Sequence, residues 1–293
     1  MPWPLISLKN GLFFNLNKEN LLSGAKINLN LKIHDGLQDN YHKIESDIIP
    51  VGIFDEIVIK ESQKDQIVFN IDKLNYELTT IHKSLSLMRK LNPSFDKSFE
   101  IKVDKQIPIE SGLGGGSSNG AAIINFLCSN YELSMPSYHD VVKQVGSDVP
   151  FFINKQPATI SGIGENVLNL NDTPPMKIII AVPKNGLSTK EVFEKYDEIQ
   201  PKDTEKYSWN GISLFNDLWN ISTEIYPELN AIKQNLEDRY KKNFFMSGSG
   251  SALFSLFEEH EEIEEIDSEE FNLKYFSITK KRSEEHTSEL QSR

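Results

Sequence analysis

The chain contains a single cysteine, Cys128, among 293 residues. One thiol cannot form an intramolecular disulfide, and it cannot build a cysteine-based metal site alone, so both are excluded. No apolar run approaches the roughly 18 residues of a membrane-spanning helix, so no membrane partner is expected. The N-terminus lacks a basic segment followed by an apolar core, which argues against a signal peptide and favours a cytoplasmic protein.

An excess of positive charge is also missing. Asp and Glu outnumber Lys and Arg by 43 to 31, which gives a net charge of −12. Nucleic-acid binding through a basic face is therefore not expected, and an anionic ligand must be met by a local positive site. The 38% hydrophobic and 25% charged residues are ordinary for a globular protein. The length allows two domains or one large one.

The most informative stretch is residues 108–122, with the sequence PIESGLGGGSSNGAA. Residues 99–103 before it alternate like a strand, and residues 121–128 after it are apolar like a buried helix. A glycine-rich loop between a strand and a helix N-terminus suits a phosphate, because the backbone can approach closely and the first helical N–H groups lack partners. A flexible, serine-capped loop is the competing interpretation. The loop is not a Walker A motif, since no Lys precedes Ser117.

This loop resembles the phosphate-binding loop of the GHMP kinases. Its triple glycine resembles the branch that phosphorylates 4-diphosphocytidyl-2-C-methyl-D-erythritol, with mild departures at Asn119 and Gly120. Gly120 should weaken the first helical turn by up to about 1 kcal/mol relative to Ala. The serines are candidates for positions near a magnesium ion, and no metal ligand is assigned. The resemblance implies that ATP is bound by Pro108, Gly112, Leu113, Gly114, Gly115, Gly116, Ser117 and Ser118.

Residues 25–33 alternate apolar with polar side chains, which predicts a half-buried strand. Its polar face carries Lys26, Asn28, Asn30 and Lys32. A solvated strand face is the ordinary explanation of such a pattern. The segment resembles the family's A-K-I-N-L opening, which implies a catalytic Lys26 and a substrate-binding Asn28.

Tyr41 and His42 follow a turn and resemble the family's Asp-Gly-Tyr-His segment. Such a pair alone usually serves packing, whereas the resemblance implies that Tyr41 stacks on cytosine and His42 reads its polar edge. Ser188 and a Glu three residues later predict a capped helix start. Next to it, Thr189 and Phe193 match residues that border the family's cytidine pocket.

Asp148 lies in the segment GSDVPFF. An acidic residue at a turn more often caps the backbone than takes part in catalysis. A carboxylate beside this apolar run will be partly buried and therefore needs a partner. The match to the family's G-[AS]-D-V-P-F-F implies that Asp148 is the catalytic base. Residues 161–165 resemble the family's G-x-G-E turn. A second glycine turn, Ser247, Gly248, Ser249 and Gly250, resembles the motif that approaches the phosphates from the C-terminal domain.

The remaining patterns predict strands at 44–48, 54–59, 66–70, 177–182 and 275–280, and helices at 78–91, 212–219 and 227–240. The acidic residues 258–271 are predicted to form an amphipathic surface helix. Thr79 stands where relatives often have Asn, so no adenine pocket is assigned.

The resemblance covers residues 24–280 and implies a two-domain α+β fold. Residues 23–170 would form an N-terminal domain like domain 2 of ribosomal protein S5, and residues 171–281 a ferredoxin-like C-terminal domain, with the site between them. We expect residues 1–22 to be a poorly ordered extension. Residues 282–293 resemble a sequencing adapter translated in frame, and we hypothesise that they are not native.

The implied reaction is transfer of the γ-phosphate of ATP, with Mg²⁺, to the 2-hydroxyl of 4-diphosphocytidyl-2-C-methyl-D-erythritol in non-mevalonate isoprenoid synthesis. Lys26 would keep Asp148 ionised and oriented. One alternative is another GHMP kinase such as a homoserine kinase, against which the triple glycine and Tyr41-His42 argue. The other is a nucleotide-binding protein without catalysis, against which Lys26 and Asp148 argue.

Overall fold

The computed structural model describes residues 19–278 except residues 40, 172, 200–203, 264–267 and 269. Most of the predicted N-terminal extension and the whole predicted non-native tail lie outside the described residues. The first strand, β1 (Glu19–Asn28), begins with Glu19 paired to Ile59. Residues 19–22 therefore belong to a sheet, and the expectation that the extension reaches residue 22 is wrong for these four positions.

The larger sheet has nine strands within the described residues, and its main order is β4-β5-β3-β2-β10-β9. β1 also pairs with β3, and β6 pairs with β3 and β7. β10 joins by parallel pairing with β2, so the C-terminal half of the chain adds two strands to this sheet. The bounds are β2 (Asn30–Gln38), β3 (Tyr41–Ser62), β4 (Gln66–Phe69), β5 (Ser98–Asp104), β6 (Ala158–Gly162), β7 (Asn166–Asn169), β9 (Tyr207–Trp209) and β10 (Ile212–Asn216).

The long strand β3 is continuous where the sequence predicts two separate strands. Pro50 pairs with Lys26 of β1 on one side. On its other side, the pairing with β6 ends at Ile48 and the pairing with β5 begins at Glu56. Proline lacks the N–H that a central strand donates, so it is tolerated at this open stretch of strand edge.

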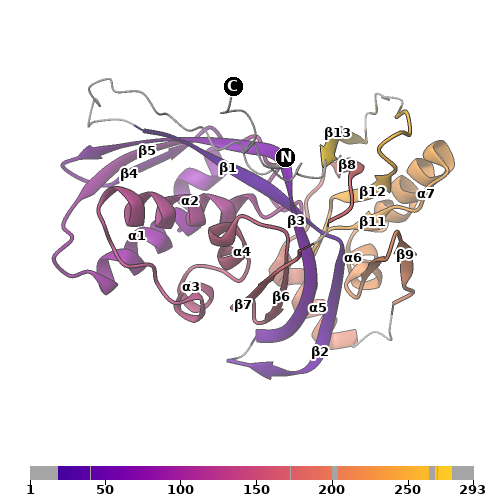
Figure 1. Ribbon diagram of the computed structural model, residues 1–293, viewed down its shortest axis with the longest axis horizontal. Coiled ribbons are helices and arrows are strands. Elements are labelled where there is room, and N and C mark those ends of the chain that lie inside the picture. Colours follow the sequence, from indigo (N-terminus) through magenta and orange to yellow (C-terminus); the bar gives the residue numbers. More distant parts are fainter. Residues whose placement is uncertain are drawn as a thin grey trace, which may run out of the picture.

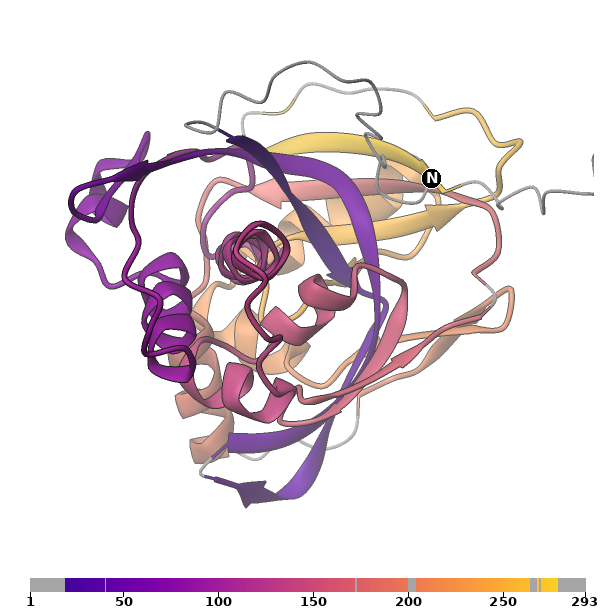
Figure 2. The ribbon, with the colours of Figure 1, turned by 60° about the vertical axis from the view of Figure 1, so that its left-hand side comes forward.

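Helices cover one face of the larger sheet, and Figures 1 and 2 show them gathered on one side of the long curved strands. They are the 3₁₀ helix η1 (Asp72–Tyr76), α1 (Thr80–Leu91), α2 (Gly115–Asn130), α3 (Tyr138–Gln144) and α4 (Val149–Asn154). Ile57, Phe99 and Ile101 of the strands pack with Ile123 and Leu127 of α2 in a buried core. This packing fixes the N-terminus of α2 relative to the sheet.

The smaller sheet is antiparallel, with the order β11-β12-β8-β13. Its strands are β8 (Met176–Pro183), β11 (Phe245–Met246), β12 (Leu253–Phe257) and β13 (Phe271–Ile278), and its helices are α5 (Thr189–Ile199), α6 (Trp219–Ile225) and α7 (Glu228–Tyr240). One face packs on these helices through residues such as Ile179 and Leu236. The other face packs on the larger sheet, where Ile27 and Ile49 meet Ile180 and Phe254. The predicted α+β fold class is confirmed.

Two helix predictions are wrong. Residues 212–216 form strand β10, and the helix there begins only at Trp219. Residues 258–263, the described start of the predicted acidic helix, are not helical. There the backbone N–H of Glu258 donates to the carboxylate of Glu261, which also pairs with Lys242, so the acidic side chains stabilise a turn instead.

The predicted helices at 78–91 and 227–240 are confirmed as α1 and α7. In the described part of the chain, no helix has the length and hydropathy needed to cross a membrane.

Candidate active site

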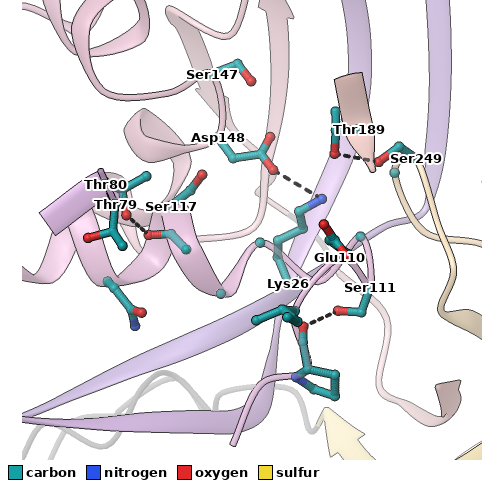
Figure 3. Close-up of a pocket in the computed structure, with 18 of the residues that line it drawn as sticks. Lys26, Thr79, Thr80, Glu110, Ser111, Ser117, Ser147, Asp148, Thr189 and Ser249 are labelled. Atoms are coloured by element: carbon teal, nitrogen blue, oxygen red, sulfur yellow. Dashed lines mark hydrogen bonds and ion pairs between the residues drawn. The ribbon is translucent and has the colours of Figure 1, made fainter. Parts of the chain in front are cut away.

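A cavity of about 430 Å³ lies where the two sheets and their helices meet. This volume is in the range of pockets that hold small organic ligands. Figure 3 shows polar side chains entering it from several elements. The residues predicted from sequence that line it are Lys26, Asn28, Pro108, Gly112, Gly114, Gly115, Gly116, Ser117, Asp148, Thr189, Phe193, Gly248 and Ser249.

The glycine-rich loop ends at the N-terminus of α2, which opens into this cavity. Gly114 precedes the helix with a φ of 72°, and a Cβ there would lie 2.8 Å from the ring of Phe152. At Gly112, a Cβ would lie 2.1 Å from the carbonyl oxygen of Ser247 in the second glycine turn. Glycine is therefore required for the two turns to approach each other. The 16-residue helix α2 directs its unpaired N–H groups and positive dipole end toward the cavity.

Two residues of the predicted loop set do not line the cavity. Leu113 is fully buried in the core between the two sheets. Ser118 accepts a hydrogen bond from the hydroxyl of Ser23 at 2.7 Å, on the buried side of α2. Of the two adjacent serines, Ser117 is the one whose surroundings allow contact with a ligand.

Asp148 and Lys26 form an ion pair inside the cavity, with 3.3 Å between Lys26 Nζ and Asp148 Oδ2 (Figure 3). Asp148 immediately precedes α4, yet its side chain makes no capping hydrogen bond, which contradicts the interpretation of Asp148 as a structural cap. The Lys26 side chain is 4% exposed and that of Asp148 is 25% exposed. A buried ammonium thus holds a partly exposed carboxylate, a suitable arrangement for a group that accepts a proton from a bound hydroxyl.

The turn at residues 161–165 packs against the backbone of Ser147, the residue before Asp148. A Cβ at Gly164 would lie 2.2 Å from the carbonyl oxygen of Ser147, so only glycine lets the two turns pack together. Glu165 of the same turn accepts a hydrogen bond from Gln38 at the end of β2. The turn therefore links the segment of Asp148 to the β2–β3 hairpin that carries Tyr41 and His42.

Asn28 and Ser247 join the two glycine turns to the first strand. The backbone N–H of Asn28 donates to Ser247 Oγ at 3.0 Å, and that hydroxyl donates to the carbonyl oxygen of Gly112 at 3.1 Å. The Asn28 amide donates to Ser46 and accepts from Lys26. Asn28 lines the cavity, but its side-chain atoms are already bonded to protein groups, so its predicted contact with substrate stays a prediction.

The second glycine turn reaches the cavity through Gly248 and Ser249, whereas Ser247 and Gly250 lie behind it. Thr189, the first residue of α5, forms a 2.8 Å hydroxyl contact with Ser249 (Figure 3). Asn216 of β10 holds the turn by donating to the carbonyl oxygens of Met246 and Gly248, each at 2.8 Å. Asn216 was not among the predicted site residues, because its segment was predicted to be a helix and forms strand β10 instead.

The aromatic residues of the predicted base clamp are not all brought together. Phe193 lines the cavity, but Tyr41 and His42 are not part of its lining. The ring of His42 stacks on Phe193 with 5.3 Å between centroids, whereas Tyr41 is 48% exposed at the start of β3. Among the described ring contacts, Tyr41 has none with Phe193, so the direct partner of Phe193 is His42.

A buried ion pair beneath the glycine loop was also missed. Asp55 is fully buried, accepts from the backbone N–H groups of Gln106 and Ile107 at 2.8 Å each, and pairs with Lys105. Asn119 of α2 donates to the same carboxylate at 2.8 Å. Asp55 therefore ties both ends of the glycine loop to β3. Burial lowers the pKa of the Lys105 ammonium, and the Asp55 carboxylate opposes that shift.

A sequence signal for Asp55 exists, because it occupies an inward position in the alternation Ile53, Asp55, Ile57, Ile59. A carboxylate at such a position requires a buried partner.

Near β4, η1 and α1 the cavity is lined by four apolar residues together with Glu77 and Lys83; the apolar residues are Phe69, Leu74, Leu78 and Ile81. Thr79 and Thr80 begin α1 beside it, and Thr80 donates to the carbonyl oxygen of Gly116. Apolar side chains that lie near a helix N-terminus suit a flat base attached to phosphates.

Within the residues that the structure describes, no group of three or more His, Cys, Asp or Glu side chains could hold a metal ion. Magnesium, however, is commonly bound by one or two protein oxygens together with substrate phosphates. Ser117 supplies a hydroxyl to the cavity wall at the start of α2. This side chain fits a magnesium ion that is held largely by bound phosphates.

Comparison with known proteins gives matches to both halves of the chain. The model of the GHMP kinases N terminal domain matches residues 79–156, and that of the GHMP kinases C terminal matches residues 206–269. The 4-diphosphocytidyl-2-C-methyl-D-erythritol kinase of Clostridioides difficile is 32% identical over 262 residues, which cover 83% of this chain and 88% of the relative. The same enzyme of Protochlamydia amoebophila is 32% identical over 242 residues, which cover 80% of this chain and 83% of the relative.

Among solved structures, a 4-(cytidine 5'-diphospho)-2C-methyl-D-erythritol kinase is similar with a TM-score of 0.64 and 25% identity, covering 81% of this chain and 90% of the other. A mevalonate kinase is similar with a TM-score of 0.53 and 14% identity, covering 89% of this chain and all of the other. A homoserine kinase from Cytophaga hutchinsonii is similar with a TM-score of 0.50 and 14% identity, covering 84% of this chain and 88% of the other. The last two share the fold alone. The matched domain models fall on either side of the predicted domain boundary near residue 170, whose exact position stays a prediction.

Proposed function

Since this chain belongs to the 4-diphosphocytidyl-2-C-methyl-D-erythritol kinases of the GHMP family, we propose that it transfers the γ-phosphate of ATP to the 2-hydroxyl of that cytidylyl sugar alcohol. The chain is an ATP-dependent small-molecule kinase. The reaction is a step of isoprenoid synthesis that does not use mevalonate. The observation that carries the proposal is the Lys26–Asp148 ion pair in the same cavity as the N-terminus of α2.

We propose that ATP lies along the cavity from α1 to the glycine loop. The adenine lies beside Leu74 and Leu78, and the phosphates lie against the N–H groups at the start of α2. Magnesium, when bound, would neutralise phosphate charge, and the hydroxyl of Ser117 is the group that would hold it beside the phosphates. The loop backbone orients the γ-phosphate toward the acceptor without a side chain in between.

In the same proposal, the acceptor hydroxyl lies next to the carboxylate of Asp148. Phosphoryl transfer depends on alignment and charge stabilisation more than on covalent chemistry, so the protein needs one proton acceptor and a fixed geometry. Asp148 takes the hydroxyl proton, and Lys26 holds the carboxylate in position. Asn28, Thr189 and Ser249 border the same region and supply polar contacts to the substrate.

The test is a phosphate-transfer assay of the purified chain with ATP and three acceptors: the cytidylyl sugar alcohol, homoserine and mevalonate. We expect phosphorylation of the first and none above background for the others. If homoserine or mevalonate is phosphorylated faster than the cytidylyl sugar alcohol, the proposed substrate is wrong, but the assignment as a kinase stands. No transfer to any acceptor by a folded, ATP-binding chain would favour the alternative of a nucleotide-binding protein without catalysis.

Phe193→Ala and Tyr41→Ala should each raise KM for the cytidylyl substrate about 5- to 150-fold, because stacking of a base on an aromatic ring is worth about 1–3 kcal/mol. KM for ATP should stay close to the wild-type value. Tyr41 is 48% exposed, so its loss should hardly change the melting temperature. Both KM values and the melting temperature are measured for each variant. If the melting temperature falls and KM for the cytidylyl substrate does not rise relative to KM for ATP, the two rings serve hydrophobic packing and not base binding.

A further inference from the structure

Glu110 places a carboxylate on the wall of the cavity, and the proposed chemistry does not use it. The residue belongs to the glycine-rich loop, next to Ser111, and lines the cavity (Figure 3). Its Oε1 lies 3.4 Å from Lys73 Nζ. The side chain makes no other hydrogen bond with the residues that the structure describes, so Oε2 can accept a hydrogen bond from a ligand.

The backbone of Glu110 is held by a segment from the C-terminal half of the chain. The N–H of Leu187 donates to the Glu110 carbonyl oxygen at 2.8 Å. A Cβ on Gly186 would lie 2.6 Å from the Cβ of Glu110, so the two segments are in close contact. The φ of Glu110 is 54°, in the left-handed region, where the loop turns. The root of the side chain is therefore fixed, and the carboxylate moves by side-chain rotation alone.

The two neighbours of this carboxylate locate it between the ends of the proposed nucleotide site. Lys73 belongs to η1, and the next residue, Leu74, is one of the apolar residues beside which the adenine is proposed to lie. In the other direction, the loop continues from Glu110 to the start of α2, where the phosphates are proposed to bind. Since the ribose is bonded to both the base and the α-phosphate, it must cross the part of the cavity beside Glu110.

A carboxylate suits the hydroxyl groups of a ribose. The 2′- and 3′-hydroxyls are adjacent donors, and an ionised carboxylate has two oxygens that only accept. Hydrogen bonds to an ionised acceptor are stronger than neutral ones. Acidic side chains bind ribose hydroxyls in this way in dinucleotide-binding folds. A carboxylate near a triphosphate also repels it, and the ammonium of Lys73 opposes that repulsion.

We propose that Glu110 is a specificity residue for the nucleotide: its carboxylate accepts hydrogen bonds from the ribose hydroxyls of ATP and so favours ATP over its deoxy analogues. This inference rests on the proposed function, since it uses the placement of ATP given there. The side chains of Lys73 and Glu110 are 57% and 44% exposed, so their ion pair contributes little to folding and Glu110 can be replaced without loss of the fold.

The test compares Glu110→Gly and Glu110→Gln with a control, Glu61→Gln. Glycine adopts a positive φ readily, so Glu110→Gly removes the carboxylate without straining the loop, and Gln keeps the size of the side chain without its charge. Glu61 is a matched control, because it pairs with Lys97 at 2.8 Å, is 38% exposed and lies outside the cavity lining.

For each protein, calorimetry in the presence of Mg²⁺ and without acceptor gives Kd for ATP, 2′-deoxy-ATP and 3′-deoxy-ATP. KM for each nucleotide is measured with the cytidylyl substrate, next to the melting temperature. In the wild type we expect Kd for at least one deoxy analogue to be about tenfold above that for ATP, the cost of about one lost hydrogen bond to a charged group.

Glu110→Gly should raise Kd and KM for ATP to about the values of that deoxy analogue, which itself should bind as it does to the wild type. The preference for ATP then disappears, because the ribose hydroxyl no longer has an acceptor. Glu110→Gln should act in the same direction with a smaller effect, since the amide oxygen still accepts. Glu61→Gln should keep the wild-type preference, and the melting temperature of Glu110→Gly should not fall.

Equal wild-type Kd values for the three nucleotides, or an undiminished preference for ATP in Glu110→Gly, would overturn the inference. So would tighter binding of all three nucleotides by Glu110→Gly in equal measure, because the carboxylate would then only repel the phosphates. The binding measurement needs no acceptor and is therefore separate from the proposed function. A wild type that prefers ATP through Glu110 and does not phosphorylate the cytidylyl sugar alcohol would refute the proposed substrate alone.

Discussion

Asp148→Asn is expected to lower kcat by about 10²–10⁴-fold, the usual cost of losing a general base, while KM for ATP and for the acceptor stay near wild type. Asn keeps the shape of the side chain and removes the proton acceptor. The Asp148 side chain makes no capping bond that the substitution could break. Lys26 retains its second partner, the side-chain oxygen of Asn28, so the buried ammonium is not left unpaired.

The measurement is steady-state kinetics with melting temperature and a binding assay for both substrates. Asp140→Asn is the matched control, because Asp140 also lies at the start of a short helix but outside the cavity lining. The control should keep wild-type kcat. A loss of less than about threefold in Asp148→Asn, well below the range for a general base, would remove Asp148 from the proposed chemistry.

Gly116→Val is expected to raise KM for ATP by about 10–100-fold, as expected for a steric overlap of about 1–3 kcal/mol. Gly116 is the second residue of α2 and lines the cavity, and a Cβ built there meets nothing within 4 Å. The new side chain therefore fits the protein and occupies space assigned to the phosphates. Because glycine is among the poorest helix formers, the melting temperature should not fall.

Gly115→Val is the contrasting variant. A Cβ at Gly115 would lie 2.8 Å from Ile107 Cγ2 and 3.0 Å from Lys105 Nζ, so the clash falls in the buried floor of the loop. This variant should lose stability, whereas Gly116→Val should lose ATP affinity. Unchanged ATP affinity in folded Gly116→Val would exclude the start of α2 from the nucleotide site. A Gly115→Val protein as stable as wild type would contradict the packing beneath the loop.

The sequence by itself determined the features that depend on neighbouring residues along the chain. The alternation in residues 25–33 and 99–103 predicted strands, and the glycine loop followed by an apolar run predicted the start of α2. The resemblance of two separate motifs to those of the GHMP kinases singled out Lys26 and Asp148 as a candidate catalytic pair, and the structure places the two side chains 3.3 Å apart. The strand and helix predictions succeeded because period and glycine content act over a few positions, whereas the catalytic roles of Lys26 and Asp148 stay a prediction.

The tertiary structure decided what depends on contacts between distant segments. Residues 212–216 form a strand because Phe215 and Asn216 pair with Asn30 and Leu31 of β2, far away in the sequence. Ser117 and Ser118 are adjacent and alike, and only the packing of α2 turns the first to the cavity and the second to Ser23.

The Asp55–Lys105 pair and the contact of His42 with Asp197 join residues that no local pattern connects. A local pattern constrains backbone conformation, whereas the partner of a side chain is fixed only when sheets and helices pack and bring distant groups within bonding distance.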